Sequence, residues 1–344
     1  MDLFDLRHTC RPDEALLYRR GDSNDVRLGE VVRTAPADYP GAQVVIVGCP
    51  QDEGVRRNGG RAGAAAAPTE IRRALYKLSI NSIESVRLFD LGDIVIQPTL
   101  EETHDLHQRV VRQIVEDGKR LIVLGGGNDI AYPDCAGLVQ AGHSDALAFN
   151  IDAHLDVRAD PIRNSGTPYR QLLEEGCIAP DNFFEIGYQP FANSPVYERY
   201  LRDRGAHLVS LAELRTQEIS RIFSQFLRLP TLVISDSDEQ VSLEPIWRAR
   251  SSTLPPIFWG FDLDVVRAAD APGVSAPNPT GMTGDELCRI ASIAGFDRRT
   301  RIVEFSEVNP SYDVDGRTAR LTAVAIWHVL AAMARRSLMA APSE

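Results

Sequence analysis

Short runs of apolar and β-branched residues alternate with stretches of helical periodicity over most of the chain. Runs of this kind predict strands buried on both faces, and their alternation with helices predicts a parallel sheet covered by helices on both sides. Ligands of such sheets gather at the carboxyl ends of the strands, so chemistry is expected there. The predicted strands span residues 44–48, 121–125, 146–152, 183–187, 256–266 and 301–309.

Helical patterns lie between these strands, and their ends carry the expected signals. Pro68 at a helix start and Gly118 at a helix end follow the usual preferences of helix termini. A final helix over residues 316–336 is apolar on most sides, which predicts burial against the sheet. The other predicted helices begin at Leu100, Ser194 and Asp285.

The chain shows no repeat, low-complexity tract or obvious linker. We therefore predict a single domain over residues 1–344, with a less regular N-terminal segment over residues 1–40. The hydrophobic share of 44% and the charged share of 25% are those of a globular protein with ample core.

Charge and cysteine content exclude several classes of partner and compartment. The net charge of −11 argues against a nucleic acid or a membrane as partner, because both would repel the chain. The 5 cysteines are widely spaced and form no C-x-x-C pair, which predicts reduced thiols. The N-terminus lacks the apolar core of a signal peptide, and no stretch reaches the ~18 apolar residues of a membrane span. We expect a cytoplasmic protein.

Acidic residues stand at the ends of the predicted strands. Asp152, His154 and Asp156 occupy alternate positions, so an extended chain would direct all of them to one side. Asp262 and Asp264 repeat this spacing. Carboxylates held at contact distance repel one another unless cations balance them. Oxygen ligands with one imidazole suit Mn²⁺ better than a structural zinc site, so we expect Mn²⁺ as cofactor.

The segments GGGND, DAHLD, FDLDVV and EVNP, in this order, resemble those of the ureohydrolase superfamily of arginases, agmatinases and formimidoylglutamases. The resemblance extends over residues 44–328. It implies an α/β fold, a three-layer α/β/α sandwich with a mainly parallel central sheet and two manganese ions at its carboxyl edge. It also implies a homo-oligomer, a trimer or hexamer, that acts on a small amidine or guanidine.

The resemblance further implies the role of each acidic residue. Asp152 and Asp262 correspond to carboxylates that bridge both metals. Asp156 and Asn128 would complete the ligand shell of one ion. Most of the family has histidine where this chain has Asn128, and a neutral amide binds Mn²⁺ more weakly than imidazole. We therefore expect two ions per chain at full loading, with a weak first site.

The second metal shell would be completed by His154 and Asp264. Glu307 corresponds to the glutamate that holds the cationic amidine or guanidinium of the substrate. Glu307 and Asp156 are the predicted catalytic residues. A metal-poor binding protein without catalysis is the alternative that the substitution at Asn128 leaves open.

The loop NSGTPYR decides between members of the superfamily. Arginases have a histidine proposed as a proton shuttle where this loop has Tyr169, which argues against arginase. The loop and the segment at residues 52–68 resemble formimidoylglutamase, which hydrolyses N-formimidoyl-L-glutamate to L-glutamate and formamide in histidine degradation. An arginase, agmatinase or other guanidine-type ureohydrolase is the alternative.

The substrate of formimidoylglutamase has a carboxylate tail, which arginine side chains could bind. Arg56, Arg57 and Arg61 are candidates, although each could equally form a structural salt bridge, and the sequence does not say which one faces the pocket. Asn193 is a weaker candidate for the pocket wall. The predicted substrate-binding residues are Asn164, Ser165, Tyr169, Arg57, Arg61 and Tyr188.

Overall fold

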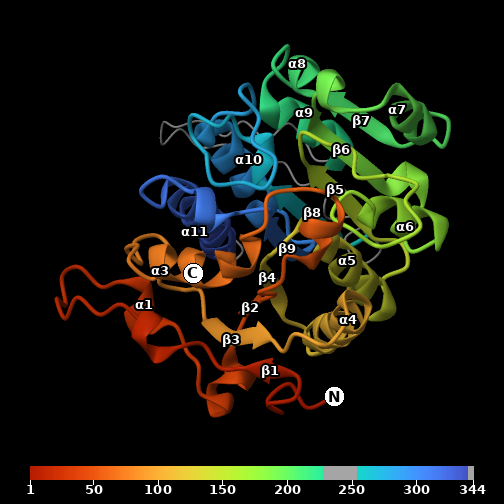
Figure 1. Ribbon diagram of the computed structural model, residues 1–344. Helices are drawn as coiled ribbons and strands as arrows, with labels where there is room; N and C mark the ends of the chain where they lie inside the picture. The colour runs from red at the N-terminus through yellow and green to blue at the C-terminus, as the bar shows by residue number, and fades with distance from the viewer. Residues whose placement is uncertain (228–253, 340–344) are drawn as a thin grey trace.

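The computed structural model describes residues 1–227 and 254–339 of the chain. Within these residues, nine strands form one sheet in the order β1-β3-β2-β4-β9-β8-β5-β6-β7 (Figure 1). All neighbouring strands are parallel except β1, which pairs antiparallel with β3. The strands are β1 (Thr9–Cys10), β2 (Val44–Gly48), β3 (Leu88–Ile94), β4 (Arg120–Leu124), β5 (Leu147–Ile151), β6 (Phe183–Tyr188), β7 (His207–Ser210), β8 (Ile257–Asp262) and β9 (Thr300–Ser306).

Helices cover both faces of this sheet (Figure 1). Alternate residues of β2 belong to two separate hydrophobic cores: Ile46 packs in one, and Val45 and Val47 pack in the other. A strand that contributes to two cores must lie between two layers of helices. The fold is therefore the predicted three-layer α/β/α sandwich with a mainly parallel sheet.

The helices divide between the two cores. Residues of α3, α8, α9, α10 and α11 belong to the first core, and residues of α4, α5, α6 and α7 belong to the second. Both α4 and α10 begin with a capping box, in which Thr99 pairs with Glu102 and Thr283 pairs with Glu286. The helices are α1 (Leu28–Val31), α2 (Glu53–Arg57), α3 (Ala67–Leu75), α4 (Leu100–Glu116), α5 (Ala131–Gln140), α6 (Pro168–Glu174), α7 (Pro195–Arg202), α8 (Leu211–Leu214), α9 (Ile219–Leu227), α10 (Gly284–Phe296) and α11 (Arg317–Met339).

The sequence patterns locate the central strands but miss β1, β3 and β7. Two aspartates and a glycine in β3 are unusual for a strand. Their burial is possible because Arg72 of α3 donates hydrogen bonds to Asp90 at 2.8 Å and to Asp93 at 2.5 Å. β7 is a short edge strand with a polar start. The hydrogen bonds from Arg72 of α3 thus stabilise β3 as a strand, although its own sequence does not favour one.

None of the helices in the described ranges is both long enough and apolar enough to cross a bilayer. The longest, α11, packs against α10 and α3, as its apolar sequence predicts.

Candidate metal centre and active-site pocket

Four strands that are neighbours in the sheet, β4, β9, β8 and β5, deliver the predicted site residues to its carboxyl edge. Asp152 directly follows β5, Asp262 ends β8 and Glu307 directly follows β9. Asn128 begins the short helix η4 (Asn128–Ile130) after the glycine run that leaves β4. A side chain at Gly126 would lie 1.8 Å from the Gln51 carbonyl oxygen, so only glycine lets the chain pass there.

The first cluster of ligand atoms consists of Asp152, Asp156 and Asp262, whose carboxylate oxygens lie within 4.8 Å of one another. Asn128 lies against this cluster. Its Nδ2 atom donates to Asp156 Oδ2 at 2.7 Å and to Asp152 Oδ2 at 3.2 Å. The structure thus brings together the four residues that the sequence assigns to the first metal.

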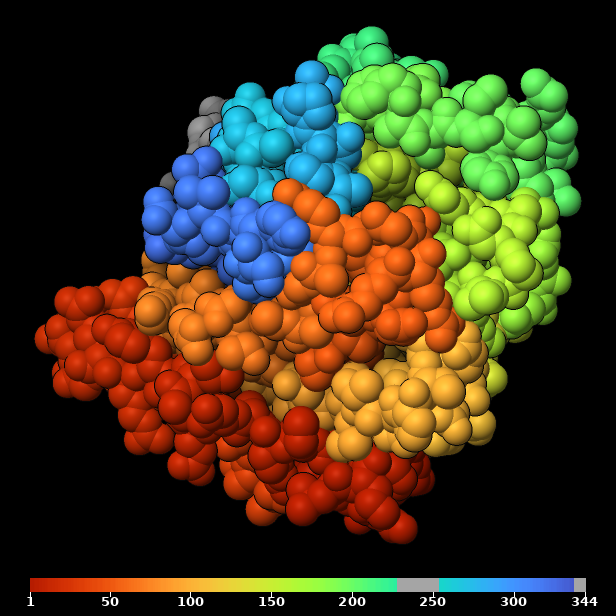
Figure 2. Space-filling model, viewed as in Figure 1, coloured from red at the N-terminus to blue at the C-terminus, as the bar shows by residue number. Residues whose placement is uncertain are grey.

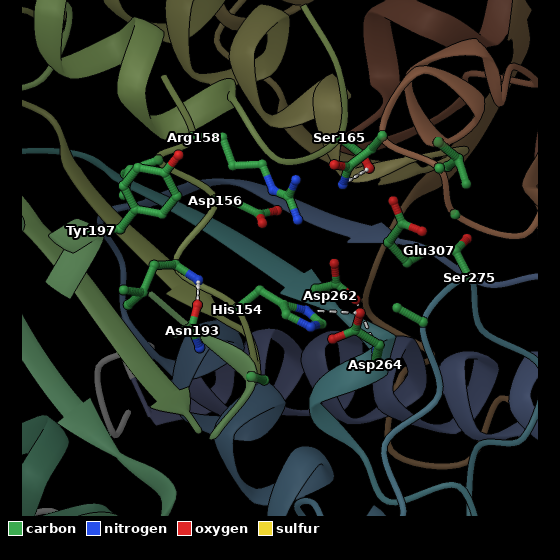
Figure 3. A pocket seen from close by; sticks show the side chains of 18 of the residues that line it. His154, Asp156, Arg158, Ser165, Asn193, Tyr197, Asp262, Asp264, Ser275 and Glu307 are labelled. Carbon is green, nitrogen blue, oxygen red and sulfur yellow. Dashed lines mark hydrogen bonds and ion pairs between the residues drawn. The ribbon is translucent and has the colours of Figure 1, made fainter. Parts of the chain in front are cut away.

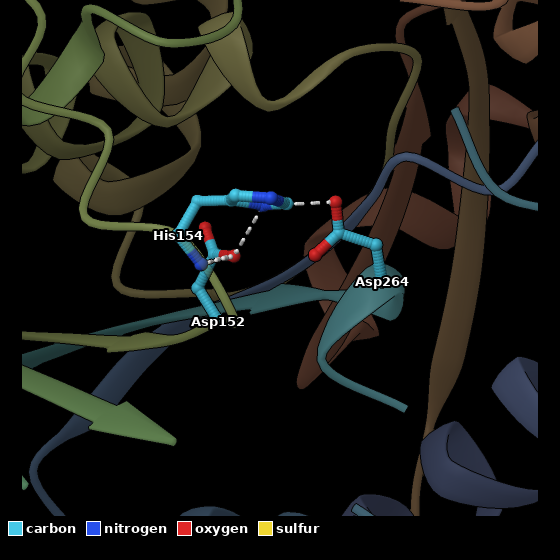
Figure 4. A group of neighbouring side chains, drawn as sticks. All are labelled: Asp152, His154 and Asp264. Carbon is cyan, nitrogen blue, oxygen red and sulfur yellow. Dashed lines mark hydrogen bonds and ion pairs between the residues drawn. The ribbon is translucent and has the colours of Figure 1, made fainter. Parts of the chain in front are cut away.

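The second cluster consists of Asp152, His154 and Asp264 (Figure 4). The Nδ1 atom of His154 lies 3.1 Å from Asp264 Oδ2 and 3.5 Å from Asp152 Oδ1. The nearby Asp264 carboxylate raises the pKa of His154 to about 12, despite its burial.

The electrostatics of both clusters fit a bound cation. Burial and the neighbouring carboxylates raise the pKa of Asp156 and of Asp262 well above the usual value. Burial likewise raises the pKa of Asp264 to about 6, and its Oδ1 atom is buried without a hydrogen-bond partner among the described residues. Hard oxygen donors with one imidazole match Mn²⁺. The residues present therefore fit the two ions that the sequence predicts.

The amide of Asn128 is oriented with its nitrogen toward the carboxylates. Its Oδ1 atom accepts a hydrogen bond from Ser306 Oγ at 3.0 Å. Ligation through oxygen would require the amide to reverse, so that Nδ2 faces Ser306. A hydroxyl group accepts as well as donates, so Ser306 can satisfy either orientation.

Glu307 lies beside the first cluster and faces the pocket. Its Oε1 atom accepts from the backbone N–H of Asn128 at 2.7 Å. Burial raises the pKa of Glu307 to about 8. Glu307 has a φ of 62° and Asp156 a φ of 46°, a left-handed backbone that non-glycine residues adopt only when their surroundings impose it. Both predicted catalytic residues are thus held in strained positions.

A pocket of about 470 Å³ opens above the two clusters, next to the orange segment of α2 and its following loop (Figures 2 and 3). Its floor contains His154, Asp156, Asp262, Asp264 and Glu307. Its wall includes Asn58, Arg61, Arg158, Ser165, Asn193, Tyr197 and Ser275. The pocket therefore combines an acidic floor with several hydrogen-bond donors.

Comparison with known proteins agrees with this geometry. A profile of the arginase family matches residues 42–332. The chain belongs to the arginase family. Its relatives include formimidoylglutamase of Klebsiella pneumoniae subsp. pneumoniae, 30% identical over 316 residues, or 89% of this chain and 92% of the relative. Formimidoylglutamase of Aromatoleum aromaticum is 33% identical over 325 residues, 88% of this chain and 86% of the relative.

Among solved structures, Trypanosoma cruzi formiminoglutamase with Mn²⁺ has a TM-score of 0.78 and 31% identity, and the match covers 91% of this chain and 99% of that one. These findings confirm the predicted family and fold. This member of the arginase family is a hydrolase of the type that acts on amidine C–N bonds.

The predicted substrate-binding residues divide into two groups in this arginase-family chain. Ser165 and Arg61 line the pocket. The Arg61 guanidinium is already engaged, because it donates to the Val274 carbonyl oxygen and stacks 4.1 Å from the centre of the Tyr312 ring. Of the three candidate arginines, Arg61 is therefore the one at the pocket. Its guanidinium is used in contacts between residues of the protein.

The structure places the other four outside the pocket lining. Arg57 is one of the four and donates to Glu101 at 2.6 Å, a structural ion pair. The third candidate arginine, Arg56, forms a similar pair with Asp52 at 3.0 Å. Asn164 donates to Asp160 at 3.0 Å, within its own loop. The remaining two are aromatic.

Tyr169 is completely buried, with its ring against Phe183 and its hydroxyl below Gly260. Tyr188 is buried too and hydrogen-bonds to Glu198 and Arg202. Neither tyrosine lines the pocket. Tyr188 belongs to β6 itself, whereas Tyr169 of α6 packs against the β6 residue Phe183.

The sequence patterns missed Arg158 and Asn58. The alternation of Asp152, His154 and Asp156 continues to Arg158, and this signal could have identified it. The Arg158 side chain points into the pocket (Figure 3). Asn58, which donates to Ser165 Oγ at 3.0 Å, comes from a distant segment and carries no local signal.

Proposed function

We propose that this chain hydrolyses N-formimidoyl-L-glutamate to L-glutamate and formamide, with two Mn²⁺ ions held by Asn128, Asp152, His154, Asp156, Asp262 and Asp264. The observation that carries the proposal is a pocket lined by groups of opposite character. Its lining combines the Glu307 carboxylate with the Arg158 guanidinium, Asn58 and Ser165. An amidine with a carboxylate tail is complementary to both kinds of group.

Glu307 is proposed to bind the amidinium group of the substrate. Its Oε1 atom is fixed by the Asn128 N–H, which orients the carboxylate in the pocket lining. A carboxylate and an amidinium form charge-assisted hydrogen bonds, which orient the planar carbon of the substrate. Glu307 therefore acts by positioning the carbon that is attacked.

Arg158 is proposed to bind the carboxylate tail. Its Nε atom lies within 3.0 Å of the place that a side chain at Gly166 would occupy, so the guanidinium rests on Gly166. The same place is 3.2 Å from Asn58 Nδ2. Guanidinium and amide N–H groups that converge in this way suit a carboxylate. Agmatine and guanidine have no carboxylate, so this part of the pocket favours a substrate of the formimidoylglutamate class.

When bound, Mn²⁺ would supply the charge that lowers the pKa of water, so that hydroxide is available near neutral pH. The protein residues contribute the rest. The backbone N–H of His154 donates to Asp152 Oδ1 at 2.7 Å, and the N–H of Asp264 donates to Asp262 Oδ1 at 2.8 Å. These hydrogen bonds fix the orientation of the two carboxylates proposed to bridge the ions.

The decisive experiment assays Mn²⁺-loaded protein in parallel on N-formimidoyl-L-glutamate, arginine, agmatine and guanidine. We expect formamide and glutamate from the first substrate and little or no urea from arginine. Efficient urea release without formamide would favour an arginase or agmatinase instead. Binding of formimidoylglutamate without turnover, by protein that holds both ions, would favour a binding protein.

The role of Arg158 is tested with Arg158→Ala and a matched control, Arg170→Ala. Arg170 lies on α6 and pairs with Glu174 at 2.8 Å, and it does not line the pocket. Loss of a charge-assisted contact worth roughly 1.5–3 kcal/mol predicts a KM about 10- to 100-fold higher for Arg158→Ala. Turnover of N-formimidoylpropylamine, which lacks carboxylates, should not change. An equal loss on both substrates would contradict the assignment.

A further inference from the structure

A group of arginines lies at the amino edge of the sheet, the edge opposite the metal centre. Arg120 is the first residue of β4 and Arg301 is the second residue of β9. Arg298 lies in the turn between α10 and β9, and Arg336 lies near the end of α11. We call these four residues the arginine cluster.

The strand register places two members of the cluster side by side. Leu121 of β4 is the partner of Ile302 of β9, so Arg120 and Arg301 precede paired positions on neighbouring parallel strands. Side chains at such positions point to the same face. That face is the one covered by α11, since the next residues of the same parity, Ile122 and Val303, belong to the core that α11 joins. The same packing places Arg336 at this face.

The arginine cluster lacks ion pairs in the described part of the chain: none of its members pairs with an acid within residues 1–227 and 254–339. Arg336 donates to the carbonyl oxygens of Gly295 and Asp297 instead of a carboxylate. The nearby Asp297 carboxylate is already held by Arg299, at 2.7 Å. Arg120 Nε is buried without a hydrogen-bond partner in the described part of the chain.

This arrangement is electrostatically unfavourable as it stands. Burial, together with Arg301 and Arg298, lowers the pKa of Arg120. Burial and the neighbouring Arg120 lower the pKa of Arg336 to about 10. Burial together with Arg301 also lowers the pKa of His143, and the Asp145 carboxylate opposes this shift. Like charges that are partly removed from water require an anion to balance them.

We propose that the arginine cluster is a binding site for a small oxyanion of the phosphate class, separate from the active site. A tetrahedral oxyanion offers acceptors in several directions, which matches arginines that come from two neighbouring strands, from the turn before β9 and from α11. The chain as a whole carries a net charge of −11, so four arginines close together form a local field of opposite sign. The bound anion would tie β4, β9 and α11 together.

The test uses the full-length protein treated with a chelator, so that phosphate cannot bind to metal ions. Inorganic phosphate is titrated by calorimetry and by the midpoint of thermal unfolding, against sodium chloride at equal ionic strength. We expect saturable phosphate binding and a higher unfolding midpoint, with no saturable effect of chloride. The double variant Arg120→Gln/Arg301→Gln should bind phosphate at least tenfold more weakly.

Two further variants keep the result interpretable. Arg298 is exposed, so Arg298→Gln should fold normally and still weaken phosphate binding about threefold or more. Arg158→Gln removes an arginine of the active-site pocket and should leave the phosphate response unchanged. Absence of saturable binding, an equal response to chloride, or full binding by Arg298→Gln and the double variant would each overturn the proposal. None of these outcomes depends on which amidine the enzyme hydrolyses.

Discussion

The two edges of the sheet hold opposite charges in different ways. At the carboxyl edge of β5 and β8, Asp152 and Asp262 each accept a backbone N–H, and Asn128 donates to the first cluster. At the amino edge, Arg120 and Arg301 have no acidic partner in the described part of the chain.

The two clusters differ in how far their geometry is fixed before a ligand binds. The carboxylates are fixed by backbone donors and by strained residues, so their geometry exists before a cation binds. Arg336 is held by two carbonyl oxygens, whereas Arg120, Arg298 and Arg301 are long side chains whose order is proposed to depend on the anion. We therefore expect substitutions at the carboxyl edge to have larger effects than those at the amino edge.

The largest effect is expected from Asp152→Ala or Asp262→Ala. Each removes a carboxylate proposed to bridge both ions, so hydrolysis should fall by at least about a thousandfold and most bound metal should be lost. Metal content is measured by plasma spectrometry. The exposed Asp181 in η5 (Pro180–Asn182) provides the control variant Asp181→Ala. Unchanged metal content in both site variants would show that the centre lies elsewhere.

A smaller effect is expected from Gly166→Ala. The new methyl group would lie 2.7 Å from Arg158 Cδ, so the Arg158 side chain must move away from the donors beside it. The KM for formimidoylglutamate should rise about tenfold, the loss of one charge-assisted hydrogen bond, while metal content is retained. Gly41→Ala, at a position with open space and without a left-handed φ, is a control for the effect of the methyl group alone. An unchanged KM for Gly166→Ala would mean that Arg158 does not contact the substrate.

Asn128→His tests how the residue at position 128 affects the metal affinity of the first cluster. Protein purified without added manganese should hold fewer than two ions per chain, and Mn²⁺ should raise its activity. Imidazole replaces a weaker amide donor, so the variant should bind the first ion more tightly, on the order of tenfold. Activity need not rise in parallel, because the pocket is shaped around asparagine.

A Mn²⁺ titration followed by metal analysis and electron paramagnetic resonance measures both affinities. Full occupancy of both sites in unsupplemented protein would show that Asn128 does not weaken the first site. Equal affinity in the histidine variant would show that residue 128 does not contact the ion.

The smallest effect is expected from Glu101→Gln, which removes a carboxylate that is paired with Arg57 at the surface. The hydrogen bond from Arg57 lowers the pKa of Glu101. A carboxylate with a lowered pKa in the folded state stabilises the protein above its unfolded pKa, and this contribution is lost as the pH falls through the folded value. The Glu101 side chain is 43% exposed, so Glu101→Gln should cost at most about 0.5 kcal/mol at pH 7 and nothing measurable near pH 3.

Urea unfolding of Glu101→Gln and the wild type at both pH values tests this expectation, with Glu84→Gln as the exposed control. A larger cost at pH 3 than at pH 7 would contradict the sign of the effect.

The sequence alone determined the central strands and the acidic residues at their ends. The reason is local: Asp152 directly follows β5, and His154 and Asp156 come within four residues of it, so all three lie at the carboxyl edge. Strand order was not needed to predict that a cation site would form there. The family and its fold followed from these same segments.

Only the tertiary structure decided which other side chains reach the pocket. Tyr169 and Arg57 stand in loops and short helices, where direction depends on contacts with Phe183 and Glu101, far away in the sequence. The orientation of the Asn128 amide likewise depends on Ser306, 178 residues away. Local periodicity carries no information about such partners, because they meet only when separate strands pack into one sheet.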